Sequence, residues 1–259
     1  MAIKKKTNNE QLTGEVFDFV KGYTDETGNI HKDFELREMT GSDEEAISKP
    51  EIKSNGAKVG RTLLERCCIR IGTIYKSDVK SQEWREIIQS LSVGDQDIML
   101  LKLRAISLGD EIETKYECVD KSCKADITTI ISIDELEINP YNGQELIDFE
   151  LPKGLKDKEG NLITKGKLRL PNGLDREVLD GVIRKNQGLA NTMMLTRCIV
   201  ELEGAKVHDD FVRQLSMKDR NYLSDLIKEN SFGVSTIVDV DCPNCGESFK
   251  ASLNVVNFI

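Results

Sequence analysis

The sequence predicts an α+β fold in which one small module occurs twice in tandem. Three observations lead to this prediction: an internal repeat, the same order of expected strands and helices in both halves, and a cysteine pair late in each half. Each module is expected to contain a β-hairpin, two helices and a cysteine-knuckle β-hairpin, with pseudo-two-fold symmetry between the modules. The expected boundaries are 14–138 for the first module, 139–147 for a linker and 148–259 for the second module, after a basic flexible tail at 1–13.

The repeat appears without gaps when the sequence is shifted by 132 positions. Residues 148–175 then fall on residues 16–43, and ten of the 28 pairs are identical, where chance would give about one or two. The identical pairs include Gly22/Gly154, Gly28/Gly160, Leu36/Leu168, Arg37/Arg169, Gly41/Gly173 and Asp43/Asp175. With small changes of offset, later pairs include Cys68/Cys198, Leu91/Leu215, Ser92/Ser216, Asp95/Asp219, Gly109/Gly233 and Cys118/Cys242. We therefore interpret the chain as a duplication.

Each half is expected to begin with a hairpin and a helix. Gly-Asn pairs supply turn residues between two short apolar segments. The strands are expected at 17–19 and 34–37 in the first half, and at 149–151 and 167–170 in the second. Apolar residues at helical spacing then predict a helix at about 57–71 and again at about 189–202.

A second helix is expected to begin at Ser92 and at Ser216. In both places an aspartate follows three residues later, so the serine can cap the helix and the acid can lie in its first turn. Gly109 and Gly233 are predicted to end these helices. A final hairpin is expected at 111–118 and 124–133 in the first half, and at 235–242 and 248–256 in the second.

The seven cysteines fall into two groups. No secretion signal precedes the chain as given, and in a reducing compartment close cysteine pairs are more often metal ligands than disulfides. Cys67, Cys68 and Cys198 lie in apolar helical segments and are interpreted as core residues. The candidate metal ligands lie in polar hairpin segments; they are Cys118, Cys123, Cys242 and Cys245.

These four cysteines predict one structural Zn²⁺ site shared between the modules. The first turn has the spacing C-x-x-x-x-C, and the second, from Cys242 to Gly246, has the form of a zinc knuckle, C-x-x-C-G. One knuckle supplies two ligands and a closed zinc site needs four, so a two-fold arrangement would complete the site. Three alternatives remain: a redox pair, free thiols in a degenerate site, and a site completed by another chain. Strand-like sequence after Cys245 disfavours the redox pair, which needs a helix N-terminus there.

Composition and missing motifs narrow the function classes. The net charge is −9 with a pI near 5.0, and no basic stripe suggests nucleic-acid binding. No apolar run is long enough to span a membrane. No phosphate-binding loop, dinucleotide fingerprint or nucleophile elbow indicates a small-molecule substrate, and His31 and His208 are interpreted as surface residues. We therefore expect a non-enzymatic protein whose partners are proteins.

Two segments carry a resemblance to a known family. The segment from Phe34 to Glu45 is similar to the opening of many tailed-phage tail and baseplate assembly proteins. The helix ending Leu101-Lys-Leu-Arg-Ala-Ile-Ser-Leu-Gly-Asp110, followed by a strand and a cysteine knuckle, resembles the baseplate hub assembly family of T-even-type contractile-tailed phages.

The resemblance implies a structural or assembly protein of a phage tail baseplate, in its hub region, with other tail and baseplate proteins as partners. It implies a location in the host cytoplasm during assembly, and in the virion tail baseplate if the protein is retained. Two alternatives remain: a cytoplasmic tail-assembly chaperone that is not retained in the particle, and a zinc-ribbon adaptor protein.

Overall fold

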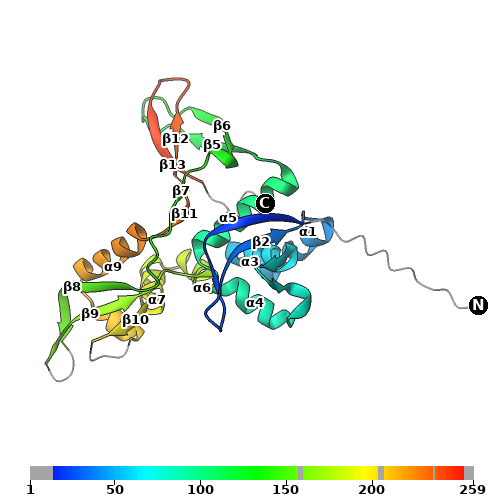
Figure 1. Ribbon diagram of the computed structural model, residues 1–259. Coiled ribbons are helices and arrows are strands. Elements are labelled where there is room, and N and C mark those ends of the chain that lie inside the picture. Colours follow the sequence, from blue (N-terminus) through cyan, green and yellow to red (C-terminus); the bar gives the residue numbers. More distant parts are fainter. Residues whose placement is uncertain (1–13, 157–159, 204–206, 236, 254–259) are drawn as a thin grey trace, which may run out of the picture.

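The computed structural model describes residues 14–156, 160–203, 207–235 and 237–253. Over these residues the chain forms two helical lobes and, beside them, a lobe made of two β-hairpins (Figure 1). This mixture of helices and small sheets confirms the α+β class. The predicted tail at 1–13 and the end of the last predicted strand, 254–256, lie outside the described residues. None of the described helices is long and apolar enough to cross a membrane.

The first helical lobe packs helices against a four-stranded antiparallel sheet of order β1-β2-β3-β4. Its strands are β1 (Glu15–Thr24), β2 (Ile30–Leu36), β3 (Cys68–Ile71) and β4 (Ile74–Tyr75). Its helices are α1 (Gly41–Ile47), α2 (Pro50–Lys53), α3 (Gly56–Cys67), α4 (Ser81–Ser90) and α5 (Val93–Leu108), with a 3₁₀ turn, η1 (Lys76–Asp78). Phe34, Leu63, Trp84 and Met99 are fully or almost fully buried in its core, where apolar burial supplies most of the folding free energy.

The second helical lobe also packs helices against a small antiparallel sheet, and it has a separate core. Its three-stranded sheet has the order β10-β9-β8. The strands are β8 (Ile147–Lys156), β9 (Leu162–Leu168) and β10 (Ile199–Leu202). The helices are α6 (Gly173–Ile183), α7 (Gln187–Cys198), α8 (Asp209–Gln214) and α9 (Met217–Glu229). Its buried cluster includes Phe149, Leu168, Leu195 and Leu223, and shares no residue with that of the first helical lobe.

The hairpin lobe takes one antiparallel hairpin from each half of the chain. Its strands are β5 (Glu111–Glu117), β6 (Asp126–Ser132), β12 (Ile237–Asp241) and β13 (Ser248–Ser252), and a 3₁₀ turn, η2 (Ile133–Glu135), follows β6. Below the lobe, β7 (Ile138–Asn139) pairs with β11 (Gly233–Val234), so the start of the predicted linker lies against the segment of the second half that precedes its cysteine hairpin.

Two predicted helices are shorter than expected. α3 and α7 end at Cys67 and Cys198, and the chain continues directly as the strands β3 and β10. Hydrogen bonds tie the chain to the sheet at these points. The N–H of Arg37 donates to the carbonyl of Cys67, and the N–H of Arg169 donates to the carbonyl of Cys198. A short apolar run has no periodicity that separates a strand from the end of a buried helix. The expectation of only two helices per module is also wrong, because α1, α2, α4, α6 and α8 are additional helices.

Of the two predicted glycine helix ends, one is confirmed and the other is wrong. Gly109 follows α5 directly, as expected, and has φ +94°. α9, in contrast, ends at Glu229 and is capped by Asn230, so Gly233 does not end it. Gly233 begins β11 instead, and a Cβ at this position would lie 2.7 Å from the Cα of Gly94. The glycine is therefore needed for a close backbone approach between the two halves.

The predicted serine caps are present, and their aspartates do more than cap. Ser92 accepts the N–H of Asp95, and Ser216 accepts that of Asp219. Asp95 is fully buried, and its carboxylate also accepts the backbone N–H groups of β1 at residues 20–22. Asp219 likewise accepts the N–H of Lys153 in β8. Each aspartate thus joins a helix start to an irregular part of a strand.

A buried ion-pair network occurs in each helical lobe. In the first, Asp43 has no solvent exposure and contacts Arg37 at 2.7 Å and Arg66 at 2.6 Å. Burial alone would raise the pKa of Asp43, but hydrogen bonds from Arg37, Thr40 and Arg66 outweigh it and hold the pKa well below its usual range. The corresponding network in the second helical lobe consists of Asp175, Arg169 and Arg197, and it also lowers the pKa of the aspartate.

His31 was expected at the surface, and this prediction is wrong. Its side chain is 8% exposed, and Nε2 lies 3.0 Å from Oδ2 of Asp25. A Cβ at Gly72 would collide with the imidazole ring, so the neighbouring turn closes tightly over it. His208 is exposed, and its Nδ1 accepts the N–H of Phe211 at the start of α8.

Candidate metal centre

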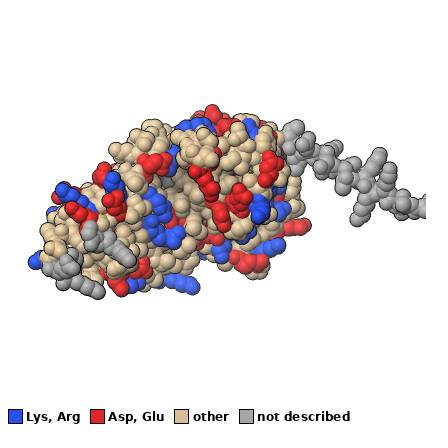
Figure 2. Space-filling view, turned by 60° about the horizontal axis from the view of Figure 1, so that its bottom comes forward, with Lys and Arg blue, Asp and Glu red and all other residues tan. Residues whose placement is uncertain are grey.

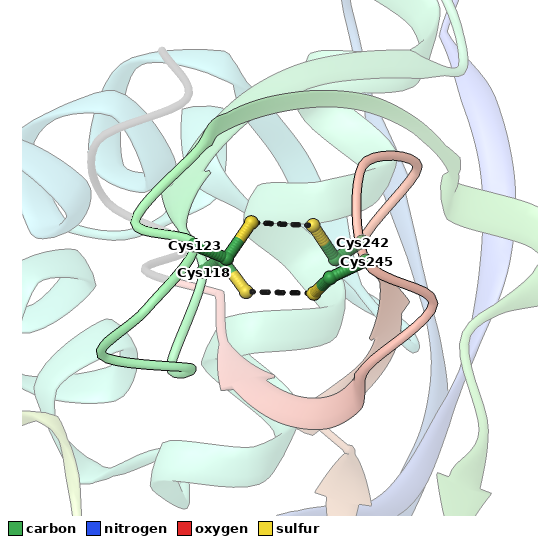
Figure 3. Close-up of side chains that lie close together, drawn as sticks. All are labelled: Cys118, Cys123, Cys242 and Cys245. Carbon is green, nitrogen blue, oxygen red and sulfur yellow. Dashed lines mark hydrogen bonds between the residues drawn. The ribbon is translucent and has the colours of Figure 1, made fainter.

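The two hairpins of the hairpin lobe place the four predicted cysteines at one point (Figure 3). Cys118 and Cys123 come from the β5–β6 turn, and Cys242 and Cys245 come from the β12–β13 turn. All four Sγ atoms lie within 4.8 Å of one another. The sequence prediction thus identified a set of side chains that the fold brings together across more than a hundred residues.

The distances between the sulfur atoms suit a metal centre. Sγ of Cys118 lies 3.7 Å from that of Cys245, and Sγ of Cys123 lies 3.8 Å from that of Cys242. Four thiolates around a tetrahedral metal at about 2.3 Å stand about 3.8 Å apart, whereas a disulfide needs about 2.05 Å. The four cysteines are free, and their spacing fits a metal ion held by both hairpins.

The contacts between the two turns are reciprocal. The first cysteine of each turn approaches the second cysteine of the other turn, as the dashed lines in Figure 3 show. This is the pattern that a local two-fold relation produces, because each hairpin presents the same groups to its partner.

Each turn reaches this geometry through a residue with positive φ. Gly246 follows Cys245 and has φ +76°, as the knuckle pattern requires, and its N–H donates to the carbonyl of Cys242. In the longer turn Lys124 follows Cys123 and has φ +47°, which makes it the one non-glycine residue with positive φ in the described residues. The C-x-x-x-x-C turn is therefore followed by a residue with positive φ, as the knuckle is.

Side-chain hydrogen bonds support the longer turn. Asp120 accepts the N–H and the hydroxyl of Ser122 at 2.8 and 2.7 Å, which closes a local turn. Asn244, from the opposite hairpin, donates its amide to Sγ of Cys123 at 3.2 Å. Sequence reasoning missed the roles of Lys124 and Asn244. The available signals were their positions, next to a cysteine and inside the knuckle.

The environments of the thiols differ. Backbone N–H groups of Cys245 and Asn244 point at Sγ of Cys242 and lower the pKa of that thiol to about 7. Loss of solvent around Cys118 raises the pKa of its thiol to about 12. Without a cation, the thiol of Cys242 therefore ionises more readily than that of Cys118, because burial disfavours the charged form. A bound cation removes this obstacle.

The other three cysteines have no such role. Cys67, Cys68 and Cys198 are fully buried in the cores of the helical lobes. Burial raises the pKa of Cys67 to about 11 and that of Cys198 to about 12, so both remain neutral thiols. Their interpretation as core residues is confirmed, although Cys68 begins a strand and is not helical.

Comparison with protein families shows which family the chain belongs to. The model of the T4 bacteriophage base plate protein family matches the chain from residue 27 to residue 248. The chain belongs to this family. The match includes both cysteine turns and confirms the predicted resemblance to T-even-type baseplate proteins. Comparisons with curated proteins and with solved structures gave no match.

Proposed function

We propose that this base plate family member is a non-enzymatic structural or assembly protein of the hub region of a phage tail baseplate. The observation that carries the proposal is the family match, which extends from residue 27 to residue 248 and so includes most of both helical lobes and both cysteine turns. Its partners are then other tail and baseplate proteins, and its location is the host cytoplasm during assembly and the virion tail if it is retained.

The cysteine cluster supports a role in stability. Four thiolates with tetrahedral spacing favour zinc, and four protein ligands leave no position for water or substrate, which a catalytic zinc ion needs. Chemically, a bound Zn²⁺ would supply a cross-link between residues far apart in the sequence. We therefore propose a structural Zn²⁺ held by Cys118, Cys123, Cys242 and Cys245.

We further propose that the two halves arose by duplication. The support comes from features that recur at the offsets found in the sequence. They are the serine helix caps with their aspartates, the buried Asp–Arg networks and the cysteine turns. The reciprocal cysteine contacts favour a two-fold relation for the hairpins. Contacts between the helical lobes run from α6 to α3, α4 and α5, so we restrict the two-fold proposal to the hairpin lobe.

The charge distribution fits protein partners. On the face that Figure 2 presents, acidic and basic side chains alternate in short groups, without a continuous basic stripe. Nucleic-acid binding relies on such a stripe, because phosphate contacts dominate its affinity. We accordingly expect no affinity for DNA at physiological salt.

Two measurements test the proposal. Elemental analysis of freshly reduced protein should find about one zinc per chain; iron in its place, or no metal, would contradict the zinc assignment. Protein mass spectrometry of purified particles should find the chain in the tail baseplate. Its absence from particles, combined with an assembly defect when it is deleted, would favour the chaperone alternative.

A further inference from the structure

The start of α5, residues 91–97, packs on the second helical lobe. We call this segment the α5 corner. The N–H of Val93 donates to the carbonyl of Pro171 at 3.3 Å, and the N–H of Gly173 donates to the carbonyl of Leu91 at 3.0 Å. These hydrogen bonds satisfy backbone groups of both segments, and they fix how the two segments are aligned.

An ion pair and a close backbone approach hold the α5 corner. Arg176 donates from both terminal nitrogens to the two carboxylate oxygens of Asp97, each at 2.7 Å. A Cβ at Gly94 would lie 2.2 Å from the carbonyl oxygen of Phe232. Phe232 is only 8% exposed, and its ring also packs on Tyr141. The second helical lobe thus offers a face that the α5 corner fills.

The first helical lobe contains the equivalent face, and it is open. The residues of the second lobe that receive the α5 corner are Pro171, Asn172, Gly173, Arg176 and Phe232. At the offsets of 132 and 124 their counterparts are Met39, Thr40, Gly41, Glu44 and Leu108. All five counterparts line a groove of about 840 Å³. We call it the first-lobe groove.

The exposure of paired residues shows what the missing contact changes. Leu108 is 60% exposed, whereas its counterpart Phe232 is buried. A Cβ at Gly41 would meet no atom within 4 Å, whereas one at Gly173 would collide with Gln96 of the α5 corner. The groove therefore corresponds to the receiving face of the second lobe, without a segment among the described residues that fills it.

The second helical lobe also carries the counterpart of the α5 corner. It is the segment 215–221 at the start of α9, which we call the α9 corner. Met217 in this segment is 68% exposed, more than any other large apolar residue among those described. One half of the chain thus has an open groove, and the other half has an uncovered corner.

Charged side chains lie on both open surfaces. In the contact within the chain, the receiving face carries Arg176 and the inserted corner carries Asp97. The groove is lined by Glu44, Lys53 and Arg184, and the counterpart of Asp97 in the α9 corner is Asn221, so the ion pair within the chain has no charged equivalent. Lys218 of the α9 corner has one possible partner of opposite sign among the lining residues, Glu44. Lys218 stands at the position of the α9 corner that corresponds to Gly94. Gly94 lies so close to the carbonyl of Phe232 that a Cβ would not fit, so a contact through the α9 corner must leave more space between the backbones than the contact within the chain.

We propose that the first-lobe groove binds the α9 corner of a second copy of this chain, in a head-to-tail contact. The two surfaces are different patches, so each added copy leaves a groove and a corner free and the assembly grows as a ring or a filament. The proposal rests on the equivalence of the two halves proposed above. It does not depend on the metal, so failure of one leaves the other intact.

Sedimentation velocity of the zinc-loaded protein over a range of concentrations tests this contact. Mass should rise with concentration beyond that of a dimer. Leu108→Glu and Met217→Glu, both at exposed positions, should each weaken association at least tenfold. Leu162→Glu is the matched control, because Leu162 is 59% exposed and belongs to neither surface; it should associate like the natural protein.

Mixing the two variants separates a head-to-tail contact from a symmetric one. The Met217→Glu protein keeps its groove and the Leu108→Glu protein keeps its corner, so an equimolar mixture should form 1:1 dimers and nothing larger. A natural protein that stays monomeric at about 200 μM, well above the roughly micromolar Kd of a specific contact, would overturn the proposal. So would a mixture that stays monomeric while the natural protein associates.

Discussion

The hairpin lobe and the helical lobes keep their shape by different means. Each helical lobe buries a large apolar cluster, with Trp84 in the first and Phe149 in the second. The separate buried cluster of the hairpin lobe has four residues, and two of them, Cys118 and Cys242, are candidate metal ligands. Two-stranded hairpins with so small a core are at best marginally stable in water. The candidate metal centre thus lies in the lobe with the smallest apolar cluster.

Removing the metal should have the largest effect, and it should be confined to the hairpin lobe. Structural zinc contributes about 10 kcal/mol or more to a domain that folds around it. Chelation, or the double substitution Cys242→Ser and Cys245→Ser, should expose the amides of 111–132 and 237–252 to hydrogen exchange, while α3 and α7 stay protected. Adding chelator to the double variant should change nothing further. Equal deprotection of α3 and α7 would show that the lobes are not independent.

Breaking the buried Asp–Arg networks should act on the helical lobes instead. Asp43→Asn or Asp175→Asn leaves two arginines without their charged partner, which costs about 3–5 kcal/mol for a buried pair. Denaturant unfolding should register this loss, with the metal content unchanged. The matched control is Asp148→Asn, because Asp148 is 85% exposed and pairs with Lys167 at 3.7 Å; it should cost less than about 1 kcal/mol. Equal effects for Asp43 and Asp148 would contradict the comparison.

Acid should weaken the helical lobes through the same aspartates. Their folded pKa values are depressed, so they stabilise the fold above the ordinary aspartate pKa, near 4, and that contribution is lost as the pH falls toward the folded values. Thermal unfolding between pH 5 and pH 2 of metal-free protein, monitored in the helical lobes, should show the decline. The Asp43→Asn, Asp175→Asn double variant should show a smaller slope. An unchanged slope would mean that other carboxylates are responsible.

The two cysteine turns should respond in opposite directions to changes at the positive-φ residue, and this is the smallest effect. Lys124→Gly relieves the left-handed strain and should stabilise its turn by about 1 kcal/mol. Gly246→Ala adds that strain in open space and should destabilise its turn by a similar amount. Competition with a chromophoric chelator should therefore give slightly higher metal affinity for the first variant and lower affinity for the second. Changes of the same sign would refute the equivalence of the turns.

Much of the fold and of the candidate site could be predicted from local patterns. The serine caps at Ser92 and Ser216 follow from backbone chemistry within four residues, and the structure contains both. The four cysteines stood out because they lie in polar hairpin segments, unlike Cys67, which is core. Helix ends were harder to predict: the apolar run after Cys67 suits a strand or a helix equally, and the neighbouring strand β2 decides between them.

The sequence alone determined which local features each half contains: the repeated segments, the helix caps and one pair of closely spaced thiols. The tertiary structure alone decided how the halves meet. His31 is buried because a distant turn closes over it, and Leu108 is exposed while Phe232 is covered because the α5 corner packs on one lobe only. The physical reason is that local patterns record which conformations a segment favours. Contacts between distant segments depend on shape and charge that exist only once both are folded.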